Sequence, residues 1–472
     1  MSDTEKNPVE NTAEKAINEK ALKRSIIVVA AFAAFVPSFM ATALNLALPA
    51  IGAEFEANAV SLGWVLNSFA LSTGIFLLIS GRLGDLYGRV KIFFLGMVLF
   101  TIATLLLVFS QSMTMLIVLR VVQGITSAMV FGTIMAIVTG SFSQGERGMA
   151  VGINLTSTYL GLSLGPLLGG LLIQHFGWRS IFLTLIPFLI ITIVLIKIYL
   201  KHDTAQSRGE KFDLKGSVVY AIALLAFMYG FSVLPSVIGW VCLGTGLLFG
   251  ILFVFMELKT ETPIFEFRLI MNNRMFAFSS AASVIIYTSI GTIGFFNSLY
   301  LQHIKNLDAT TTGFIMITQP LGTALLSIIA GKLSDRINPG ILASIGMGIV
   351  ALGLFLFSLV NEASHVGYMI GLLALIGLGF GFFSSPNTNA IMSSVENRYL
   401  GIASGTLGTM RTIGQMLSMG TGVMLFSLFM GREVISPAIY PELLSAIRAG
   451  FLVFSILCGL GVFVSLARNK KK

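Results

Sequence analysis

The chain of 472 residues is 55% hydrophobic and only 11% charged, and its mean hydropathy is +0.90. A water-soluble protein of this size carries charge on roughly a quarter of its residues, so a soluble globular chain and an intrinsically disordered chain are both excluded. The formal net charge of +9 is compatible with nucleic-acid binding or with the basic cytoplasmic loops of a membrane protein, and the positions of the basic residues decide between the two.

Long apolar runs, separated by short polar breaks, follow one another along the whole chain. A helix needs about 20 apolar residues to cross a bilayer, and we count fourteen runs of this kind. We therefore predict an all-α membrane protein with fourteen transmembrane helices. In chain order the predicted spans are residues 25–48, 61–80, 92–109, 114–140, 149–173, 180–200, 217–234, 237–256, 276–301, 313–331, 341–360, 366–393, 401–430 and 443–467.

The segment before the first predicted span, residues 1–24, is polar and mixed in charge. It lacks the order of charged, apolar and small residues that marks a secretory signal, so we expect a cytoplasmic surface helix and an uncleaved first span.

The basic residues are distributed unevenly between the two sides of the predicted membrane. With the N-terminus inside, all but six of the 30 Lys and Arg lie in cytoplasmic segments. The six exceptions are Arg179, Lys305, Arg432 and Arg448 on the outer side and Arg120 and Arg411 within spans. The positive-inside rule then predicts a multi-pass plasma-membrane protein with both termini in the cytoplasm, and nucleic-acid binding is not needed to explain the charge.

Two parts of the chain repeat each other. The segment GRLGDLYGRVK from Gly81 to Lys91 recurs as GKLSDRINPGI from Gly331. A second set recurs at one constant spacing: Gly148, Ala150, Gly152, Gly161 and Gly169 fall on Gly401, Ala403, Gly405, Gly414 and Gly422. The repeat shifts by eight spans, so six spans are repeated and two are inserted. We predict pseudo-symmetric six-helix bundles at 25–200 and 276–467, inserted helices at 217–256 and a basic cytoplasmic tail at 468–472.

Three signatures stand in order in the first half of the chain. G-x-L-x-D-x-x-G-R-x-K between the second and third spans is complete at Gly81, Leu83, Asp85, Gly88, Arg89 and Lys91. R-x-x-Q-G in the fourth span reads Arg120, Gln123 and Gly124, and G-x-x-x-G-P-x-x-G-G in the fifth reads Gly161, Gly165, Pro166, Gly169 and Gly170. With these motifs the sequence resembles the major facilitator superfamily, and within it the fourteen-span drug:proton antiporter branch.

The resemblance implies a conformational latch at the first signature. In the family this loop is taken to hold the two bundles in the outward-facing state, which would give this role to Gly81, Asp85, Gly88, Arg89 and Lys91 and to Asp335 and Arg336 of the repeat. The simpler alternative is a topogenic loop with an i,i+4 pair between Asp85 and Arg89. The repeat has Asn338 and Pro339 in place of the Gly-Arg pair, so we expect less from Asp335 and Arg336.

The fourth-span signature implies a role in coupling for Arg120, Gln123 and Gly124. An arginine inside a span is costly unless it faces a cavity or a partner, although Arg120 is also near enough to the outer interface to snorkel. Arg411 lies deeper in its span, and we expect it in a structural hydrogen-bond network with Gln415.

The fifth-span signature implies close helix packing at Gly161, Gly165, Pro166, Gly169 and Gly170, which in antiporter-like relatives is thought to prevent leak. By analogy with the family, the substrate path runs between the first, fourth, ninth and tenth spans. Its candidate polar residues, besides Gln123, are Thr42, Asn45, Asn297, Tyr300 and Gln319.

One position departs from the branch. Relatives usually carry an aspartate in the first span, in L-D-x-T-x-x-N-x-A-L-P, whereas this chain reads FMATALNLALP with Met40 in that place. No Asp or Glu lies near the middle of any predicted span. Proton binding, if it occurs, would have to be sought at Asp85, Glu54 or another flanking carboxylate.

We therefore predict a secondary transporter that exports lipophilic small molecules by alternating access, with a proton as the expected coupling ion. One alternative is a carrier of neutral or anionic amphiphiles, such as lipids or metabolites, without coupling through a first-span carboxylate. The alternative from another class is a non-transporting membrane sensor. Two scattered cysteines and four single histidines form no ligand cluster, so we expect no enzyme activity, catalytic residues, metal or cofactor. The expected partners are a small lipophilic substrate, a proton and membrane lipid, and the expected state is a monomer.

Overall fold

A computed structural model of the chain describes residues 8–142, 147–200, 212–260, 263–265, 267–334, 336–395, 400–431 and 433–468. In these residues the structure is helical apart from one isolated β-bridge, between Asn58 and Val434. The first eight helices are α1 (Pro8–Phe55), α2 (Ala59–Tyr87), α3 (Arg89–Val108), α4 (Met113–Ser141), α5 (Arg147–Phe176), α6 (Ser180–Tyr199), α7 (Leu214–Ser232) and α8 (Val237–Lys259).

The remaining elements are shorter and more often interrupted. They are α9 (Phe267–Asn272), α10 (Arg274–Ile290), α11 (Ile293–Leu299), the π-helix η1 (Tyr300–Ile304), α12 (Ala309–Met316), α13 (Thr318–Ser334), α14 (Pro339–Ser358), α15 (Val366–Ser393), α16 (Leu400–Met430), the short 3-10 helix η3 (Pro437–Ile439) and α17 (Tyr440–Ala467).

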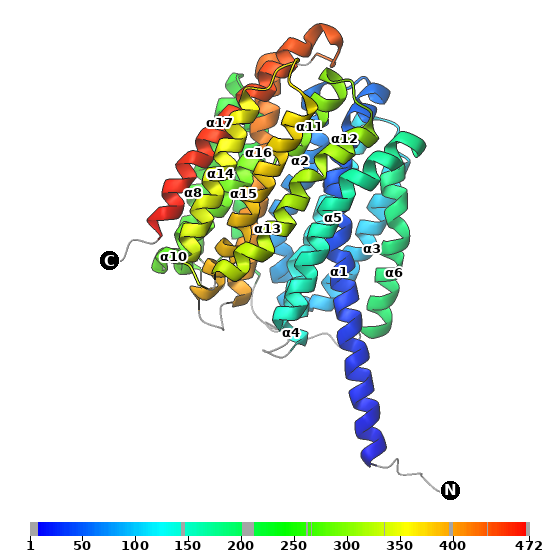
Figure 1. Cartoon of the computed structure of the whole chain (residues 1–472). Helices are drawn as coiled ribbons and strands as arrows, with labels where there is room; N and C mark the ends of the chain where they lie inside the picture. The colour runs from blue at the N-terminus through cyan, green and yellow to red at the C-terminus, as the bar shows by residue number, and fades with distance from the viewer. Residues whose placement is uncertain are drawn as a thin grey trace.

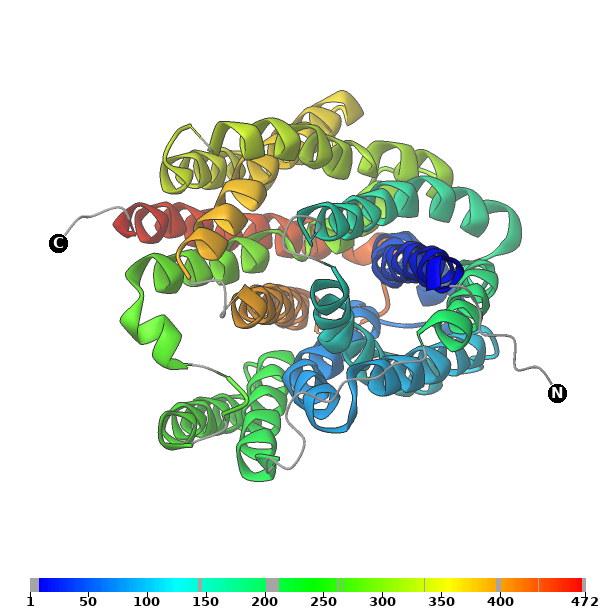
Figure 2. The same cartoon turned by 90° about the horizontal axis from the view of Figure 1, so that it is seen from below.

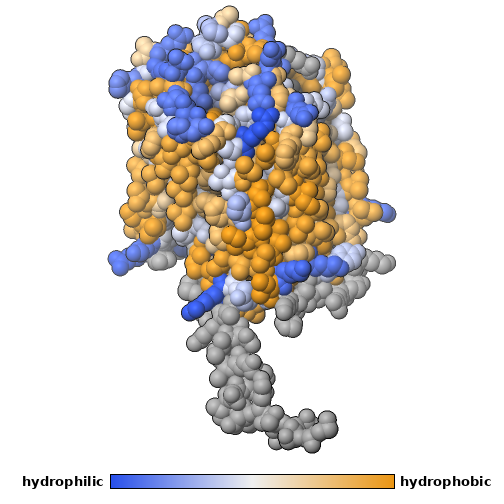
Figure 3. All heavy atoms as spheres, turned by 90° about the vertical axis from the view of Figure 1, so that its right-hand side faces the viewer, coloured by the Kyte–Doolittle hydropathy of each residue, from blue (hydrophilic) through white to orange (hydrophobic). Residues whose placement is uncertain are grey.

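Fourteen helical segments among the described residues are long and apolar enough to cross a membrane, which agrees with the predicted number. They run up and down, so that α1 begins and α17 ends at the same end of the molecule (Figure 1). We call this the terminal end and the opposite one the distal end. An apolar belt surrounds the middle of the face shown in Figure 3, and hydrophilic side chains gather above and below it, as a protein in a bilayer requires.

Polar side chains set the start of many helices. Asn58, Ser112, Asp213 and Asn273 accept hydrogen bonds from backbone N–H groups in the first turns of α2, α4, α7 and α10. These caps satisfy donors that have no partner inside a helix. Because they stand in the polar breaks between apolar runs, the breaks both end one span and begin the next.

The segment before the first span differs from the prediction. The structure continues α1 without a break from Pro8 into the span, so there is no separate surface helix before Ser25. Alanine, glutamate and lysine dominate this stretch, and they are strong helix formers. No glycine or interior proline separates it from the first span.

Two spans are broken where the sequence predicted continuous helices. The ninth is interrupted at Gly291 and Thr292, between α10 and α11, and the tenth at Ile317, between α12 and α13. Each pair is still long and apolar enough to cross the membrane as one segment, Arg274–Ile304 and Ala309–Ser334.

The helices form two six-helix bundles and an inserted hairpin. Helices α1 to α6 pack with one another, as do α10 to α17. Helix α8 pairs with α7, and α7 packs against α2 and α16. Figure 2, a view from the terminal end, shows α7 and α8 outside the two bundles. The insertion therefore contacts one helix of each bundle.

Candidate functional site

The two bundles meet tightly at the distal end. The Ser298 Oγ donates to the Asn45 carbonyl at 2.5 Å, and the Gln302 Nε2 donates to the Leu46 carbonyl at 3.1 Å. Beside this contact, the Thr310 Oγ1 donates to the Gly170 carbonyl at 3.3 Å. These bonds join α1 and α5 of one bundle to α11, η1 and α12 of the other, so the described conformation is closed at its distal end.

The fifth-span glycines create much of this packing. A Cβ on Gly161 would lie 2.6 Å from the Phe35 carbonyl oxygen, and one on Gly169 would lie 2.7 Å from the Ala43 Cβ. Gly165 touches Thr42 in the same way, so these three glycines seat α5 on α1.

The remaining two residues of that motif face the other bundle. A Cβ on Gly170 would lie 2.5 Å from the Ala309 carbonyl oxygen, and the Pro166 carbonyl touches Gly313 of α12. The motif therefore packs α5 against both halves. Its proposed role in preventing leak stays a prediction.

A second contact between the halves lies near the middle of the helices. The Tyr159 hydroxyl of α5 and the Ser384 hydroxyl of α15 are 3.1 Å apart, and both residues lie near Tyr287 of α10. The Arg411 guanidinium of α16 lies over the Tyr287 ring, 5.6 Å from its centroid. We call Tyr159, Tyr287, Ser384 and Arg411 the central cluster. All four are half-buried, so they line the junction of the bundles instead of filling either core.

The central cluster was not predicted. Tyr159 and Ser384 belong to no motif, and only the fold shows that α5 and α15 face each other at this height. Arg411 was expected in a hydrogen-bond network with Gln415, but its described contact is with the Tyr287 ring. In the sequence, the only sign of this cluster was that Arg411 and several hydroxyl-bearing residues stand in the middle of apolar runs.

Arg120 lies in the core of the first bundle and is 2% exposed. Its Nε donates to the Val65 carbonyl at 3.0 Å, its Nη1 donates to the Gln123 Oε1 at 2.5 Å, and its guanidinium stacks on Phe69 at 4.3 Å from the ring centroid. The alternative that Arg120 snorkels to the outer interface is therefore wrong, because its contacts are buried.

Met40 belongs to the same network. The Gln123 Nε2 donates to the Met40 Sδ at 3.3 Å and to the Thr104 Oγ1 at 2.8 Å. The position where relatives carry an aspartate is thus one side chain away from Arg120. The Arg120 contacts described here are all neutral, so no carboxylate takes the missing aspartate's place among them. Gly124 is packed against Phe69 and Ser72 of α2.

The latch signature forms the tight connection between α2 and α3. The Arg89 Nη2 and Nε lie 2.7 and 2.8 Å from the Asp85 Oδ1. Gly88 has φ 111°, which other residues rarely adopt, and a Cβ on Gly81 would lie 3.5 Å from the Gly132 carbonyl oxygen of α4. Lys91 is exposed. The pair fits both the latch and the topogenic alternative, so the latch stays a prediction.

The repeated signature in the second bundle is described only in part. Arg336 is exposed in the turn after α13, and Asp335 lies outside the described residues. Asn338 caps α14 by accepting from the Gly340 N–H at 2.8 Å.

The predicted path residues separate into two groups. Asn45 lies at the distal contact and packs on Gly294, while the Thr42 hydroxyl bonds back to its own helix. In contrast, the Tyr300 hydroxyl donates to the Asn361 carbonyl at 2.7 Å and the Asn297 amide to its own helix at Ile293.

The backbone of Gln319 packs on Gly377 within the second bundle. Of this set, Asn45 has described contacts with the other bundle, through its carbonyl and its packing on Gly294, whereas Thr42 packs on Gly165 within its own bundle.

Arg468, at the end of α17, forms a second buried network that the sequence did not indicate. It is 4% exposed, and its Nη1 donates to the Ser279 Oγ at 2.9 Å and to the Asn387 Oδ1 at 2.6 Å. Its Nη2 donates to the Ser465 Oγ at 2.5 Å. Burial lowers the pKa of Arg468 to about 10, so it stays charged at neutral pH.

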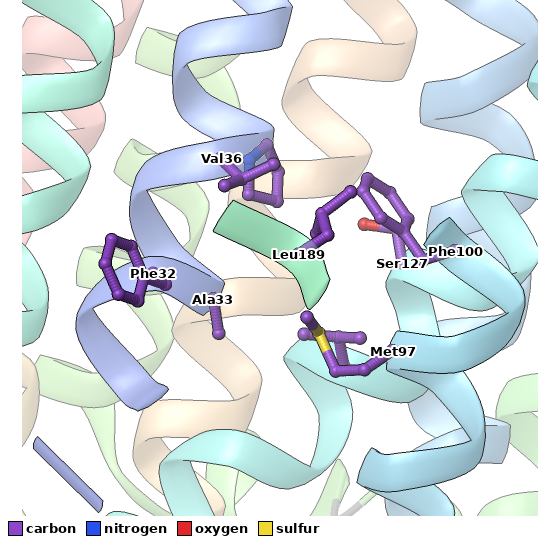
Figure 4. Close-up of a pocket in the computed structure, with 9 residues that line it drawn as sticks. Phe32, Ala33, Val36, Met97, Phe100, Ser127 and Leu189 are labelled. Atoms are coloured by element: carbon purple, nitrogen blue, oxygen red, sulfur yellow. The ribbon is translucent and has the colours of Figure 1, made fainter. Parts of the chain in front are cut away.

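A small apolar pocket lies within the first bundle, between α1, α3, α4 and α6 (Figure 4). Phe32, Met97, Phe100, Ser127 and Leu189 line it. It does not reach the second bundle, so we do not place it on the path between the halves.

Comparison with known proteins agrees with this architecture. A model of the Major Facilitator Superfamily matches residues 30–285 and 279–472. The chain belongs to the Major Facilitator Superfamily. The resemblance predicted from the motifs is thereby confirmed. Members of this superfamily are transporters and not enzymes, so the chain is a multi-pass membrane transporter of small molecules.

Two curated relatives of this superfamily transporter carry different functional names. The riboflavin transporter RibZ of Clostridioides difficile is 28% identical over 87% of this chain and 88% of its own length. The multidrug resistance protein Stp of Mycobacterium tuberculosis is 28% identical over 79% of this chain and 70% of its own length. The crystal structure of the POT family transporter PepTSo matches 95% of this chain over 97% of its own chain, with a TM-score of 0.69 and 13% sequence identity. This likeness supports the fold alone.

Proposed function

We propose that this transporter exports lipophilic small molecules by alternating access, in exchange for protons. The observation that carries the proposal is the central cluster, a half-buried aromatic and cationic surface contributed by both bundles at mid-height. Secondary transporters bind substrate near the midplane between their repeats. Tyrosine rings suit flat lipophilic molecules, which bind mainly by apolar contact and stacking.

Two of the contacts between the bundles, the distal contact and the central cluster, support the alternating mechanism, and α2 and α16 pack against each other as well. The distal contact depends on close approach at Gly170 and Gly313 and on a few hydrogen bonds. Such a contact can separate and re-form as a unit when the bundles rock about a site between them. The terminal end is then the cytoplasmic side, the membrane is the plasma membrane, and the transporter works as a monomer.

Transport into proteoliposomes tests the proposal. A panel of a neutral flavin, a lipophilic monocation and an aromatic sulfonate would be assayed with and without an imposed pH gradient. We expect transport of lipophilic compounds that depends on the gradient and falls in Tyr287→Ala. Tyr368→Phe is the matched control, because Tyr368 is exposed and its hydroxyl bonds the Leu356 carbonyl far from the cluster. Equal rates in wild type and Tyr287→Ala for every compound would exclude the central cluster as the substrate site.

A second candidate is a carrier of neutral or anionic amphiphiles. The observation that favours it is the charge of the membrane interior, where Arg120 and Arg411 have neutral described contacts and Met40 replaces an acid. A buried carboxylate attracts organic cations, and Met40 cannot do so. The relative named as a riboflavin transporter is consistent with this candidate.

Met40→Asp separates the two candidates. If the substrate is neutral or anionic, the wild type should transport the flavin or the sulfonate at least as fast as the monocation. The added carboxylate should raise cation transport and make it depend more steeply on pH. Met40→Leu keeps the site apolar and serves as the control. Strong proton-coupled transport of dications by the wild type would contradict the second candidate.

A further inference from the structure

The acidic side chains that flank the membrane spans differ in their partners. Asp85 is paired with Arg89, and Glu54 is held by the Arg179 Nη2 at 2.6 Å and by the Trp178 Nε1 at 2.7 Å. A carboxylate engaged by an arginine favours its charged form and resists protonation. A proton site should therefore be sought where carboxylates lack such a cation.

Asp213 and Glu257 meet these conditions at the terminal end of the inserted hairpin. Asp213 caps α7, its Oδ1 accepting from the Gly216 N–H at 2.8 Å. Glu257 lies in the last turns of α8, and its Oε2 accepts from the Phe265 N–H at 3.1 Å. Each carboxyl group thus has one oxygen committed to the backbone.

The other two oxygens face each other. The Asp213 Oδ2 and the Glu257 Oε1 are buried and have no hydrogen-bond donor among the described residues. A Cβ on Gly216 would touch the Asp213 Oδ2 and would lie 2.7 Å from the Glu257 Oε1, so one missing side chain lets both oxygens converge. Glu257 is 2% exposed, whereas Asp213 is half-buried and leaves a route to water.

Two ionised carboxylates in contact are both acceptors, so they repel and form no hydrogen bond. One proton turns this contact into a hydrogen bond between the two groups, whose free oxygens converge at Gly216. We propose that Asp213 and Glu257 form a proton-binding site that takes a single proton from water at the terminal end and shares it between the Asp213 Oδ2 and the Glu257 Oε1.

None of the charged groups described on the neighbouring elements forms a salt bridge with Asp213 or Glu257. Arg268 of α9 donates to the Leu258 carbonyl at 3.1 Å, and Lys215 in the first turn of α7 is exposed. Lys259 follows at the end of α8. On the adjoining bundles, the charged group of α2 at this end is Arg82. Arg411 of α16 lies at mid-height, over the Tyr287 ring.

Tyr220 of α7 is engaged elsewhere, because its hydroxyl donates to the Gly74 carbonyl of α2 at 3.1 Å. In the part of the chain that the structure describes, no salt bridge involves Asp213 or Glu257.

The site is connected to both bundles. Phe265, whose N–H the Glu257 Oε2 accepts, packs in one apolar cluster with Tyr220 and Phe253, and Leu78 of α2 and Met410 of α16 pack against that cluster. Proton binding should draw the ends of α7 and α8 together and keep this cluster on α2 and α16. Loss of the proton should separate the two acids and loosen the hairpin.

For its effect on transport this inference rests on the proposed function, because it supplies a proton site that the first span lacks. The site itself is tested without substrate. Infrared difference spectra of the full-length protein in nanodiscs, recorded while the pH is lowered, report the C=O band of a newly protonated carboxyl group. We expect the wild-type spectrum to contain one such band that is missing in both Glu257→Gln and Asp213→Asn. Asn at position 213 keeps the cap of α7, so each variant retains the local fold.

Two further variants test whether the band comes from the contact between the two acids. Gly216→Ala should also lose the band, because its methyl group separates the oxygens while both acids remain. Glu442→Gln should retain it, since Glu442 is exposed in the first turn of α17 at the other end of the molecule. A band unchanged in Glu257→Gln and Asp213→Asn would overturn the site, whatever the protein transports.

The transport assay is then run with the same pH on both sides of the membrane. We expect the wild-type rate to change with pH and the Glu257→Gln rate to be flat, because the glutamine amide donates permanently to Asp213. Wild-type pH dependence in Glu257→Gln would overturn the role of the site in transport. If no compound is transported by the wild type, the proposed function fails while the infrared result still decides the proton site.

Discussion

Among the described residues, each of the two bundles buries one arginine, and the two arginines are held differently. Arg120 in the first bundle bonds two acceptors, the Val65 carbonyl and the Gln123 amide, on α2 and α4. Arg468 in the second bundle bonds side chains of α10, α15 and α17, and its Nη2 reaches the Gly340 carbonyl of α14 at 3.3 Å. The first arginine links two helices and the second links four.

The difference suggests a division of work between the halves. A guanidinium has five N–H donors, and Arg468 uses several of them at the C-terminal end of a helix, where the helix dipole favours a cation. Arg120 has fewer acceptors, and the Gln123 side chain connects it to Met40. We infer that Arg468 fastens the second bundle and that Arg120 serves the transport cycle of the first.

The largest effect is expected at the latch, where the halves also differ. Asp85→Asn removes the charge that holds Arg89, and loss of a charge-assisted bond of about 1.5–3 kcal/mol should slow transport about tenfold or more. Arg336→Gln in the second-half repeat should stay within about twofold of wild type, because Arg336 is exposed. Transport rates and cysteine-accessibility labelling would be measured for both. Wild-type labelling of both faces in Asp85→Asn would refute the latch.

A smaller effect is expected from Arg120. Arg120→Ala removes two buried hydrogen bonds of about 1 kcal/mol each. We expect about half of this sum to be lost from the rate-limiting step, which lowers the transport rate about fivefold while the protein still folds. Arg120→Lys keeps the charge and should retain part of the rate. Initial rates in proteoliposomes, normalised to folded protein, provide the measurement. An unchanged rate in the alanine variant would remove Arg120 from the transport cycle.

Arg468 should affect stability more than rate. Arg468→Ala leaves Ser279 and Asn387 without their buried partner, which should lower the free energy of unfolding by about 2 kcal/mol. Detergent-denaturation curves of the purified protein would show the shift, and transport per folded molecule should stay near wild type. If the rate falls while the curve does not move, the proposed division between the halves is wrong.

The smallest expected effect concerns the start of α12, which meets α5 at the distal contact. Asp308 accepts from the Thr311 N–H at 2.9 Å, and this bond holds the pKa of Asp308 below its ordinary value. The stabilisation is therefore present above the ordinary pKa and is lost as the pH falls through the lowered pKa of the folded state. Asp308→Ala should cost about 1 kcal/mol at neutral pH.

Asp308→Asn keeps the cap and isolates the charge, whose contribution should be only a few tenths of a kcal/mol because the group is exposed. Thermal unfolding at neutral and at strongly acidic pH would be compared for wild type and both variants. A wild-type advantage over Asp308→Asn that persists in acid would contradict the charge argument.

The sequence by itself determined the class, the number of spans and the family. Long apolar runs can be satisfied in a bilayer only by helices, and the motif from Gly81 to Lys91 needs its glycines at fixed places, so both are visible in the order of residues. The sequence also located the polar breaks between spans, and the structure adds that Asn58 and Ser112 in these breaks cap α2 and α4.

Only the tertiary structure decided which side chains meet. Tyr159 and Ser384, Arg468 and Ser279, and Met40 and Gln123 are far apart in the chain, and their contacts depend on which helix faces each lie toward. An apolar span carries little periodicity, since lipid and core both accept Leu, Ile and Phe, so its inward face cannot be read from hydropathy. Asp213 and Glu257 converge for the same reason: α7 and α8 pack as a hairpin, and the absence of a side chain at Gly216 lets two acids share one place.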